Sequence, residues 1–142
     1  MPQKVEIEGR QPSKFILLGE DDPDDQEMLT DVFSSIDKSF KLLFVNNGKE
    51  VVSALGKLKD EQMPCLIVLD YNMPGMNGAE ILKEISGNQR YRHVPKIMWS
   101  TSGSEKFKKT CLELGAADYV LKPSNNEDLK KIANYMLSLC LV

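Results

Sequence analysis

Five short apolar runs, each followed by a segment with helical spacing, constrain the fold of this chain more than any other feature of its sequence. The runs lie at 15–18, 42–45, 65–69, 94–99 and 118–121. After each run, apolar residues recur three and four positions apart, as on one face of an amphipathic helix. Strict alternation of strand and helix favours a parallel sheet with helices on both faces. The sequence therefore predicts an α/β fold of five βα units.

Capping residues mark where the first helix begins. Asp22 can accept hydrogen bonds from free backbone amides and Pro23 suits the first helical position, so a helix should run from there to about Ile36. Asp24 and Asp25 favour the positive end of that helix. Further helical patterns are expected at 51–58, 79–85, 104–114, where Gly115 ends the helix, and from residue 127 onward.

The size and charge of the chain limit its domain organisation and its partners. Its 142 residues are 42% hydrophobic and 27% charged, which is typical of one globular domain. We expect a polar, flexible N-terminal lead over 1–13 and a single domain over 14–142, with no output domain attached. The net charge of −3 gives no general attraction to nucleic acid or to anionic lipid. Direct binding to nucleic acid or to a membrane is therefore not expected.

The cysteines and the N-terminus bear on the cellular compartment. Cys65, Cys111 and Cys140 lie far apart with no CxxC spacing, which argues against a zinc site or a disulfide framework. Free thiols of this kind fit a reducing cytoplasm. No N-terminal stretch combines a basic start with a long apolar run, and no apolar run is long enough to span a bilayer. The sequence therefore predicts a cytoplasmic protein.

Polar groups follow four of the five predicted strands. Glu20 and Asp21 follow the first, Asp70 the third, Ser100 the fourth and Lys122 the fifth. In open α/β sheets, ligands bind beyond the carboxyl ends of the strands, at a topological switch point. Carboxylates, a hydroxyl and an ammonium group are therefore expected to collect at one edge of the sheet.

Four segments resemble the receiver domains of response regulators in two-component signalling, over nearly the whole chain. These are the segments 16–23 (ILLGEDDP), 70–78 (DYNMPGMNG), 94–100 (VPKIMWS) and 115–123 (GAADYVLKP). The resemblance implies a CheY-like, flavodoxin-like (βα)5 doubly wound fold with a five-stranded parallel sheet in the order 2-1-3-4-5. It also implies a phosphoacceptor in a phosphorelay, not an enzyme acting on other substrates.

The resemblance assigns roles to the residues at the strand ends. Asp70 matches the phosphoacceptor, which takes a phosphoryl group from a phosphohistidine of a sensor histidine kinase or phosphotransfer protein. Mg²⁺ (or Mn²⁺) is implied as the cofactor, with Asp21, Asp70 and the backbone carbonyl of Asn72 as ligands and Glu20 acting through a bound water. Lys122 matches the ammonium group that contacts the phosphoryl oxygens.

Further positions match the switch that responds to phosphorylation. Ser100 matches the hydroxyl that binds a phosphoryl oxygen, with Thr101 as the alternate. Tyr119 matches the aromatic residue that changes rotamer when this hydroxyl moves, and so alters a protein-interaction surface.

Other matched positions bear on the lifetime of the phosphoryl group and on the backbone of the site. Asn72 and Ser102 match positions that tune dephosphorylation. Lys122-Pro123 matches a peptide bond that is cis in the family. Gly19 departs from the family, where an apolar β-branched residue is common.

Two other functional classes compete with this interpretation. A phosphatase of the haloacid dehalogenase type also uses a strand-end aspartate, but it needs a second Asp two positions later, where Asn72 stands. A binding module that has lost phosphorylation would lack a metal or acceptor position, and none is missing. No GxxxxGK[ST] segment is present, so direct use of ATP is not expected.

The expected partners follow from the resemblance. They are the kinase or phosphotransfer protein and a downstream protein target, with partner choice set by side chains around the first and fourth helices. The loop 87–93 resembles those of stand-alone receivers paired with phytochrome-type or other hybrid kinases. Leu139, Leu141 and Val142 can extend into a homodimer contact or pack as fraying core residues.

Overall fold

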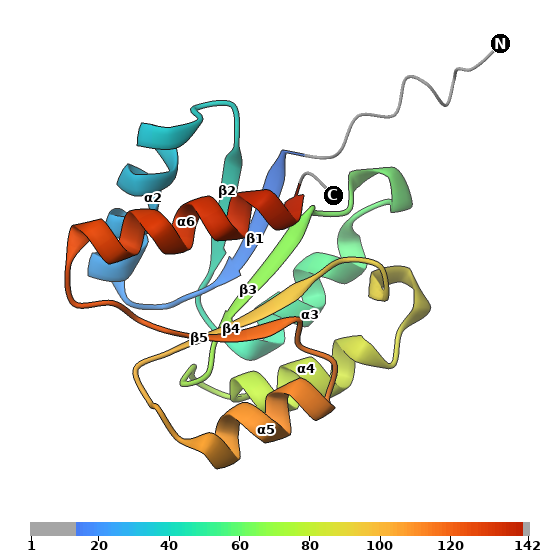
Figure 1. Ribbon diagram of the computed structural model, residues 1–142. Helices are drawn as coiled ribbons and strands as arrows, with labels where there is room; N and C mark the ends of the chain where they lie inside the picture. The colour runs from blue at the N-terminus through green and yellow to red at the C-terminus, as the bar shows by residue number, and fades with distance from the viewer. Residues whose placement is uncertain (1–13, 141–142) are drawn as a thin grey trace, which may run out of the picture.

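A computed structural model describes residues 14–140 of the chain (Figure 1). The predicted flexible lead over 1–13 and two of the three residues of the predicted homodimer contact, Leu141 and Val142, lie outside the described residues. Leu139, the third, packs in part against the core formed by α2 (Pro23–Ile36), α6 (Asn126–Cys140) and the sheet.

The described residues contain one parallel sheet of five strands in the order β2-β1-β3-β4-β5. This order confirms the predicted doubly wound, flavodoxin-like topology. Each predicted apolar run overlaps a strand whose ends differ from the prediction by no more than two residues. The strands are β1 (Phe15–Gly19), β2 (Lys41–Val45), β3 (Leu66–Asp70), β4 (Lys96–Ser100) and β5 (Asp118–Leu121).

The helices begin at side chains that accept hydrogen bonds from free backbone amides. Asp22 caps α2 by accepting from the N–H of Asp24, as its sequence position predicts. Asn47, Asn77 and Ser104 cap the next three helices in the same way. None of the helices within 14–140 is long and apolar enough to cross a membrane. The remaining elements are α3 (Gly48–Lys57), η1 (Asp60–Gln62), α4 (Gly78–Ser86), η2 (Gln89–Tyr91) and α5 (Glu105–Glu113).

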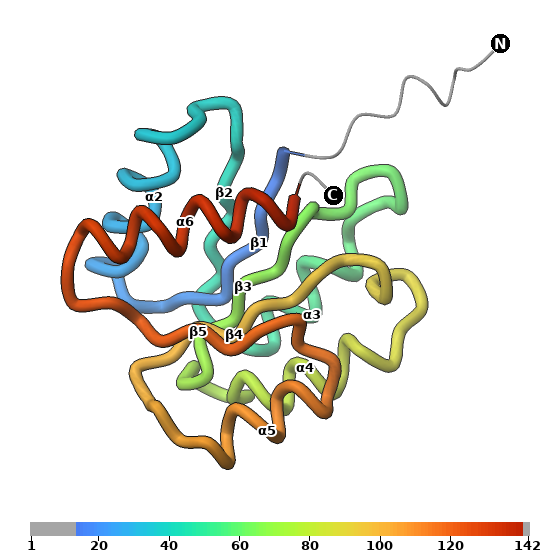
Figure 2. Tube along the Cα trace, in the orientation of Figure 1, coloured from blue at the N-terminus to red at the C-terminus, as the bar shows by residue number. Residues whose placement is uncertain are grey.

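The sheet lies between two layers of helices (Figure 2), with α2 and α6 on one face and α3, α4 and α5 on the other. Because alternate side chains of a strand point to opposite faces, each strand contributes to both layers. Leu17 and Met98 pack against α3, α4 and α5, whereas Leu18 and Trp99 pack against α2 and α6. Burial on both faces explains why the central strands are almost purely apolar in sequence.

The strand register brings the carboxyl ends of β1, β3, β4 and β5 to one edge of the sheet. Gly19 pairs with Leu69, so the residues that follow them, Glu20 and Asp70, are neighbours. Ser100 pairs with Leu121, the residue before Lys122. The polar residues predicted to meet are therefore carried to one place by the sheet itself.

The structure contradicts the prediction that the cysteines form no disulfide. Cys65 and Cys140, separated by 75 positions, are joined by a disulfide bond with their Cα atoms 4.8 Å apart. The prediction was wrong because it examined only short spacings. The crossover topology brings the start of β3 beside the end of α6, which no local spacing reveals. Cys111 is free and buried.

The bridge is expected to stabilise the domain by restricting the conformations that the unfolded chain can adopt. For a closed loop of this length, the chain-entropy relation gives about 4.5 kcal/mol. Reducing the bond, or Cys65→Ser, should lower the melting temperature by on the order of 10 °C. Thermal unfolding with and without reductant checks this: reductant should lower the melting temperature of the wild type and should leave that of Cys65→Ser unchanged. Equal melting temperatures for the oxidised and reduced wild type would contradict it.

Candidate functional site

Three carboxylates and one ammonium group meet at the carboxyl edge of the sheet. Glu20 and Asp21 follow β1 and Asp70 ends β3, and each offers a carboxylate oxygen within 4.8 Å of the others. Lys122 follows β5, and its Nζ lies 2.9 Å from Oδ2 of Asp70. Glu20 and Asp70 are buried, with 1% and 5% of their surface exposed, whereas Asp21 is exposed. The structure therefore brings together the residues that the sequence places at these strand ends.

Lys122 contacts one carboxylate that the sequence analysis did not include in the site. Its Nζ donates to Glu20 (3.1 Å), Asp70 (2.9 Å) and Asp25 (2.8 Å). From sequence, Asp25 is expected only to favour the start of a helix as an acidic residue. The available signal was the short connection from β1 to α2, which places the first turn of α2 directly over the strand ends.

The pKa of the Glu20 carboxyl is raised to about 7, chiefly because the carboxyl is buried, and the negative charge of Asp70 contributes to this upward shift. The backbone N–H of Asp22 and the ammonium of Lys122 oppose this shift by stabilising the ionised form. The indole N–H of Trp99 also donates to Glu20 over 3.1 Å. These hydrogen bonds hold Glu20 in one orientation, and its charge depends on the neighbouring charges of Asp70 and Lys122.

Two opposing effects act on the pKa of the Lys122 ammonium. Burial lowers this pKa, but hydrogen bonds from the ammonium to Asp25, Asp70 and Glu20 more than offset the burial, and the net shift is upward. The ammonium also lies 5.8 Å from the centre of the Trp99 ring. Lys122 therefore stays cationic at the carboxylate cluster across the physiological pH range.

The backbone after Asp70 orients its carboxylate. The N–H of Asn72 donates to Oδ1 of Asp70 over 3.0 Å, which leaves Oδ2 for Lys122. The N–H of Gly78 donates to the carbonyl of Tyr71, and a Cβ at Gly78 would lie only 2.9 Å from the Cα of Tyr71. A glycine at this position therefore allows α4 to begin against the end of β3.

Close packing explains the unusual glycine before Glu20. A Cβ at Gly19 would lie 2.7 Å from Cε of Met73 and 3.0 Å from Cγ2 of Val51. Both of these side chains are buried. The space that a β-branched side chain at position 19 would occupy is thus filled by Met73 and Val51.

A chain of hydrogen bonds connects the end of β4 with β5. Ser100 is fully buried, and its Oγ accepts from the N–H of Ser102 over 3.0 Å. The hydroxyl of Tyr119, a largely buried side chain, donates to the carbonyl of Ser102 over 2.8 Å. Thr101 is exposed. Of the two adjacent hydroxyl residues, Ser100 is therefore the one enclosed beside the carboxylates and linked to Tyr119.

The bond between Lys122 and Pro123, which the resemblance matches to a cis bond, is trans in this structure. No peptide bond within residues 14–140 is cis. The N–H of Lys122 donates to the carbonyl of Ser100 over 2.7 Å, continuing the β4–β5 pairing by one residue. The ladder therefore positions Lys122 with a trans bond after it. The ligand role of the Asn72 carbonyl and the tuning roles of Asn72 and Ser102 stay predictions.

The donor set fits a hard divalent cation such as Mg²⁺ or Mn²⁺. Glu20, Asp21 and Asp70 each offer a carboxylate oxygen as a metal ligand, and these ions prefer oxygen ligands. Among the described residues, no other group of three such side chains is gathered in this way. Two of the three carboxylates are also withdrawn from bulk water, so a cation would relieve their mutual repulsion.

Comparison with known proteins gives one consistent family. The family described as "Response regulator receiver domain" matches residues 16–134. Two-component response regulator ARR6 of Arabidopsis thaliana is 30% identical over 156 residues, which cover 98% of this chain and 81% of that protein. Two-component response regulator ORR5 of Oryza sativa subsp. japonica is 29% identical, with 86% and 87% covered.

Solved structures give the same result. The phosphorylated cyanobacterial phytochrome response regulator RcpA superposes with a TM-score of 0.79 at 27% identity, covering 89% of this chain and 95% of that one. The Mn²⁺-bound form of response regulator Rcp1 gives a TM-score of 0.77 at 28% identity, covering 89% and 94%.

The raised pKa of Glu20 predicts how the stability of the metal-free protein depends on pH. The folded protein holds this proton more tightly than the unfolded chain, in which the pKa is near 4.5. The protonated Glu20 carboxyl therefore contributes to the free energy of unfolding; this contribution is complete below pH 4.5 and is lost as the pH rises through about 7. In chelator, the wild type should lose on the order of 3 kcal/mol across this window, and Glu20→Gln should lose much less.

Urea unfolding between pH 5 and pH 8 measures this difference. The matched control is Asp24→Asn, which replaces an exposed carboxylate on α2 with no side-chain contact to Lys122. This variant should follow the wild-type pH dependence. Equal pH dependence in Glu20→Gln and wild type would show that Glu20 does not carry the effect.

Proposed function

Because this chain belongs to the family of response regulator receiver domains, we propose that it takes a phosphoryl group from a phosphohistidine of a partner protein onto Asp70. The observation that supports this most is the position of the Asp70 carboxylate. It is nearly buried, contacts Lys122, and lies beside the carboxylates of Glu20 and Asp21. Phosphoryl transfer depends on positioning and on positive charge around the transferred oxygens, and this arrangement offers both.

The proposed step is an in-line displacement. A carboxylate oxygen of Asp70 forms a bond to phosphorus while the P–N bond to the donor imidazole breaks, and the electron pair of that bond stays on the imidazole nitrogen. The product is an acyl phosphate on Asp70. The N–H of Asn72 fixes one oxygen of Asp70, so the carboxylate cannot rotate freely.

Glu20, Asp21 and Asp70 would hold the divalent cation, with the carbonyl of Asn72 as the proposed backbone ligand. When bound, such a cation neutralises charge on the phosphoryl oxygens. Lys122 binds a further phosphoryl oxygen, and its ammonium is already within 2.9 Å of Asp70. Mg²⁺ is the ion we propose for this chain, and the similar response regulator Rcp1 has been solved in an Mn²⁺-bound form.

The hydrogen bonds around Ser102 supply the proposed switch. In this switch, Ser100 turns its hydroxyl toward Asp70 to donate to a phosphoryl oxygen. This movement would disturb the contact with the N–H of Ser102, whose carbonyl accepts from Tyr119. Tyr119 would then reorient and change the surface formed by β5 and its neighbouring helices. A downstream protein is the proposed reader of that surface.

The chain is proposed to assist its own phosphorylation and dephosphorylation without acting on another substrate. Asn72 lies two residues after Asp70 and Ser102 lies two residues after Ser100, and both are proposed to tune the attacking water. The Asn72 side chain is exposed, and the Ser102 hydroxyl accepts from the N–H of Ser104. Neither residue carries a carboxylate that could activate the water as a base.

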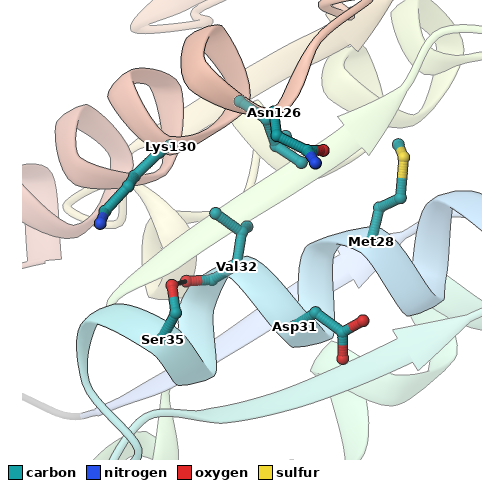
Figure 3. A pocket seen from close by; sticks show the side chains of 7 residues that line it. Met28, Asp31, Val32, Ser35, Asn126 and Lys130 are labelled. Atoms are coloured by element: carbon teal, nitrogen blue, oxygen red, sulfur yellow. Dashed lines mark hydrogen bonds between the residues drawn. The ribbon is translucent and has the colours of Figure 1, made fainter.

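The groove between α2 and α6 is the proposed docking surface for the phosphohistidine partner (Figure 3). It encloses about 290 Å³ and combines apolar side chains, such as Met28 and Val32, with polar side chains such as Lys130. Met28 is 37% exposed. The helix α2 also carries Asp25, so a partner on this groove would lie next to the phosphoacceptor site.

The proposal places the chain in the cytoplasm, where a kinase can draw its phosphoryl group from ATP. Cytoplasmic thiols are mostly kept reduced, so the redox state of the Cys65–Cys140 bridge in cells tests this location. A homodimer through Leu139 and the residues after it stays a prediction.

Replacing the acceptor should abolish phosphorylation. With Mg²⁺ and acetyl phosphate, the wild type should gain one phosphoryl group by intact mass, because its carboxylate is the nucleophile, and Asp70→Asn should gain none. Asp24→Asn, the exposed control, should behave as wild type, and chelator should stop the wild-type reaction. A gain of the same size in Asp70→Asn would place the acceptor elsewhere.

The switch should fail when the Ser100 hydroxyl is removed. Trp99 lies next to Ser100 and contacts Glu20, so its fluorescence should change on phosphorylation. Ser100→Ala should still be phosphorylated but should lose most of this change, whereas the exposed neighbour Thr101→Ala should keep it. If Thr101→Ala lost the signal and Ser100→Ala kept it, Thr101 would be the switch residue.

A further inference from the structure

We propose that Asp25 is a positioning residue that holds the Lys122 ammonium in the unphosphorylated protein and releases it when a phosphoryl group forms on Asp70. This inference rests on the proposed function and adds a residue to it. Asp25 lies in the first turn of α2, and its Oδ2 is 2.8 Å from Nζ of Lys122, the shortest of the three contacts that this ammonium makes.

The hydrogen-bonding capacity of Lys122 is fully used in this state. An ammonium group has three N–H donors and no acceptor. Glu20, Asp25 and Asp70 each accept one of these hydrogen bonds. A phosphoryl oxygen can therefore bind Lys122 only if one of the three carboxylates gives up its contact.

Asp25 is the carboxylate that can lose Lys122 at least cost. Glu20 also accepts from the indole of Trp99 and the N–H of Asp22, and Asp70 also accepts from the N–H of Asn72. Among residues 14–140, the side chain of Asp25 has Lys122 as its one hydrogen-bond donor. Its side chain is 18% exposed, compared with 1% for Glu20 and 8% for Asp70, so water can replace the lysine most readily at Asp25.

The helix that carries Asp25 stabilises the carboxylate after the lysine has left. Asp25 lies in the first turn of α2, where the free N–H groups and the helix dipole favour negative charge. Lys122 therefore exchanges one anionic partner for another, from Asp25 to a phosphoryl oxygen. The negative charge of Asp25 also opposes the approach of an anionic phosphoryl donor.

Removing the charge of Asp25 should weaken its contact with Lys122 before phosphorylation, so that the ammonium can bind a phosphoryl oxygen more readily. Asp25→Asn should be phosphorylated by acetyl phosphate roughly three- to tenfold faster than wild type at saturating Mg²⁺, because one charge-assisted hydrogen bond no longer has to be broken. Asp25→Glu keeps the charge and should restore a rate near that of wild type. Asp24→Asn removes a neighbouring exposed carboxylate and should leave the rate unchanged.

A second measurement reads the position of Lys122 without phosphorylation. In chelator, reductive methylation followed by peptide mass mapping gives the labelling rate of Lys122 relative to the exposed Lys130. Asp25→Asn should raise this ratio severalfold, whereas Asp24→Asn and Asp25→Glu should stay near wild type. Circular dichroism and the melting temperature establish that each variant is folded.

The two measurements separate this inference from the proposed function. Absence of phosphoryl gain in wild type would overturn the proposed function, while a raised labelling ratio in Asp25→Asn would still support the contact that holds Lys122. A labelling ratio in folded Asp25→Asn equal to that of Asp24→Asn would overturn the inference. So would a phosphorylation rate in Asp25→Asn that is equal to or below that of wild type.

Discussion

The contact of one ammonium group with three carboxylates is the interaction on which the rest of this site depends. Glu20 and Asp70 are buried close to each other, and two buried negative charges repel strongly unless a cation lies between them. Lys122, which directly follows the edge strand β5, supplies that cation. A divalent ion or a phosphoryl group bound at this site would therefore change the contacts between Lys122 and the carboxylates.

The sheet determines where that contact forms. Residues separated by 102 positions, Glu20 and Lys122, meet because β1 and β5 end at the same edge, with β3 and β4 between them. The N–H of Lys122 extends the β4–β5 ladder to the carbonyl of Ser100, so the backbones of these two residues are fixed relative to each other. Hydrogen bonds also link Ser100 to Ser102 and Ser102 to Tyr119, and the proposed switch uses these contacts.

Most of the fold and the strand-end residues could be predicted from sequence because they follow local rules. Apolar runs became strands, Asp22 and Pro23 began α2, and Asp70 and Lys122 stand directly at strand ends. Features that depend on packing between distant segments could not be predicted in this way. The Cys65–Cys140 bridge joins the beginning of β3 to the end of α6, and no spacing along the chain encodes that proximity.

Asp25 shows how one residue can satisfy a local rule and a tertiary one together. An acidic residue in the first turn of a helix needs no further explanation, since the helix dipole already favours it. The same turn lies over the strand ends, however, and directs this carboxylate at Lys122. A helix start that stabilises the carboxylate with or without its lysine partner lowers the free-energy cost of exchanging that partner. Stabilisation of a helix start and the proposed control of Lys122 can thus reside in one side chain.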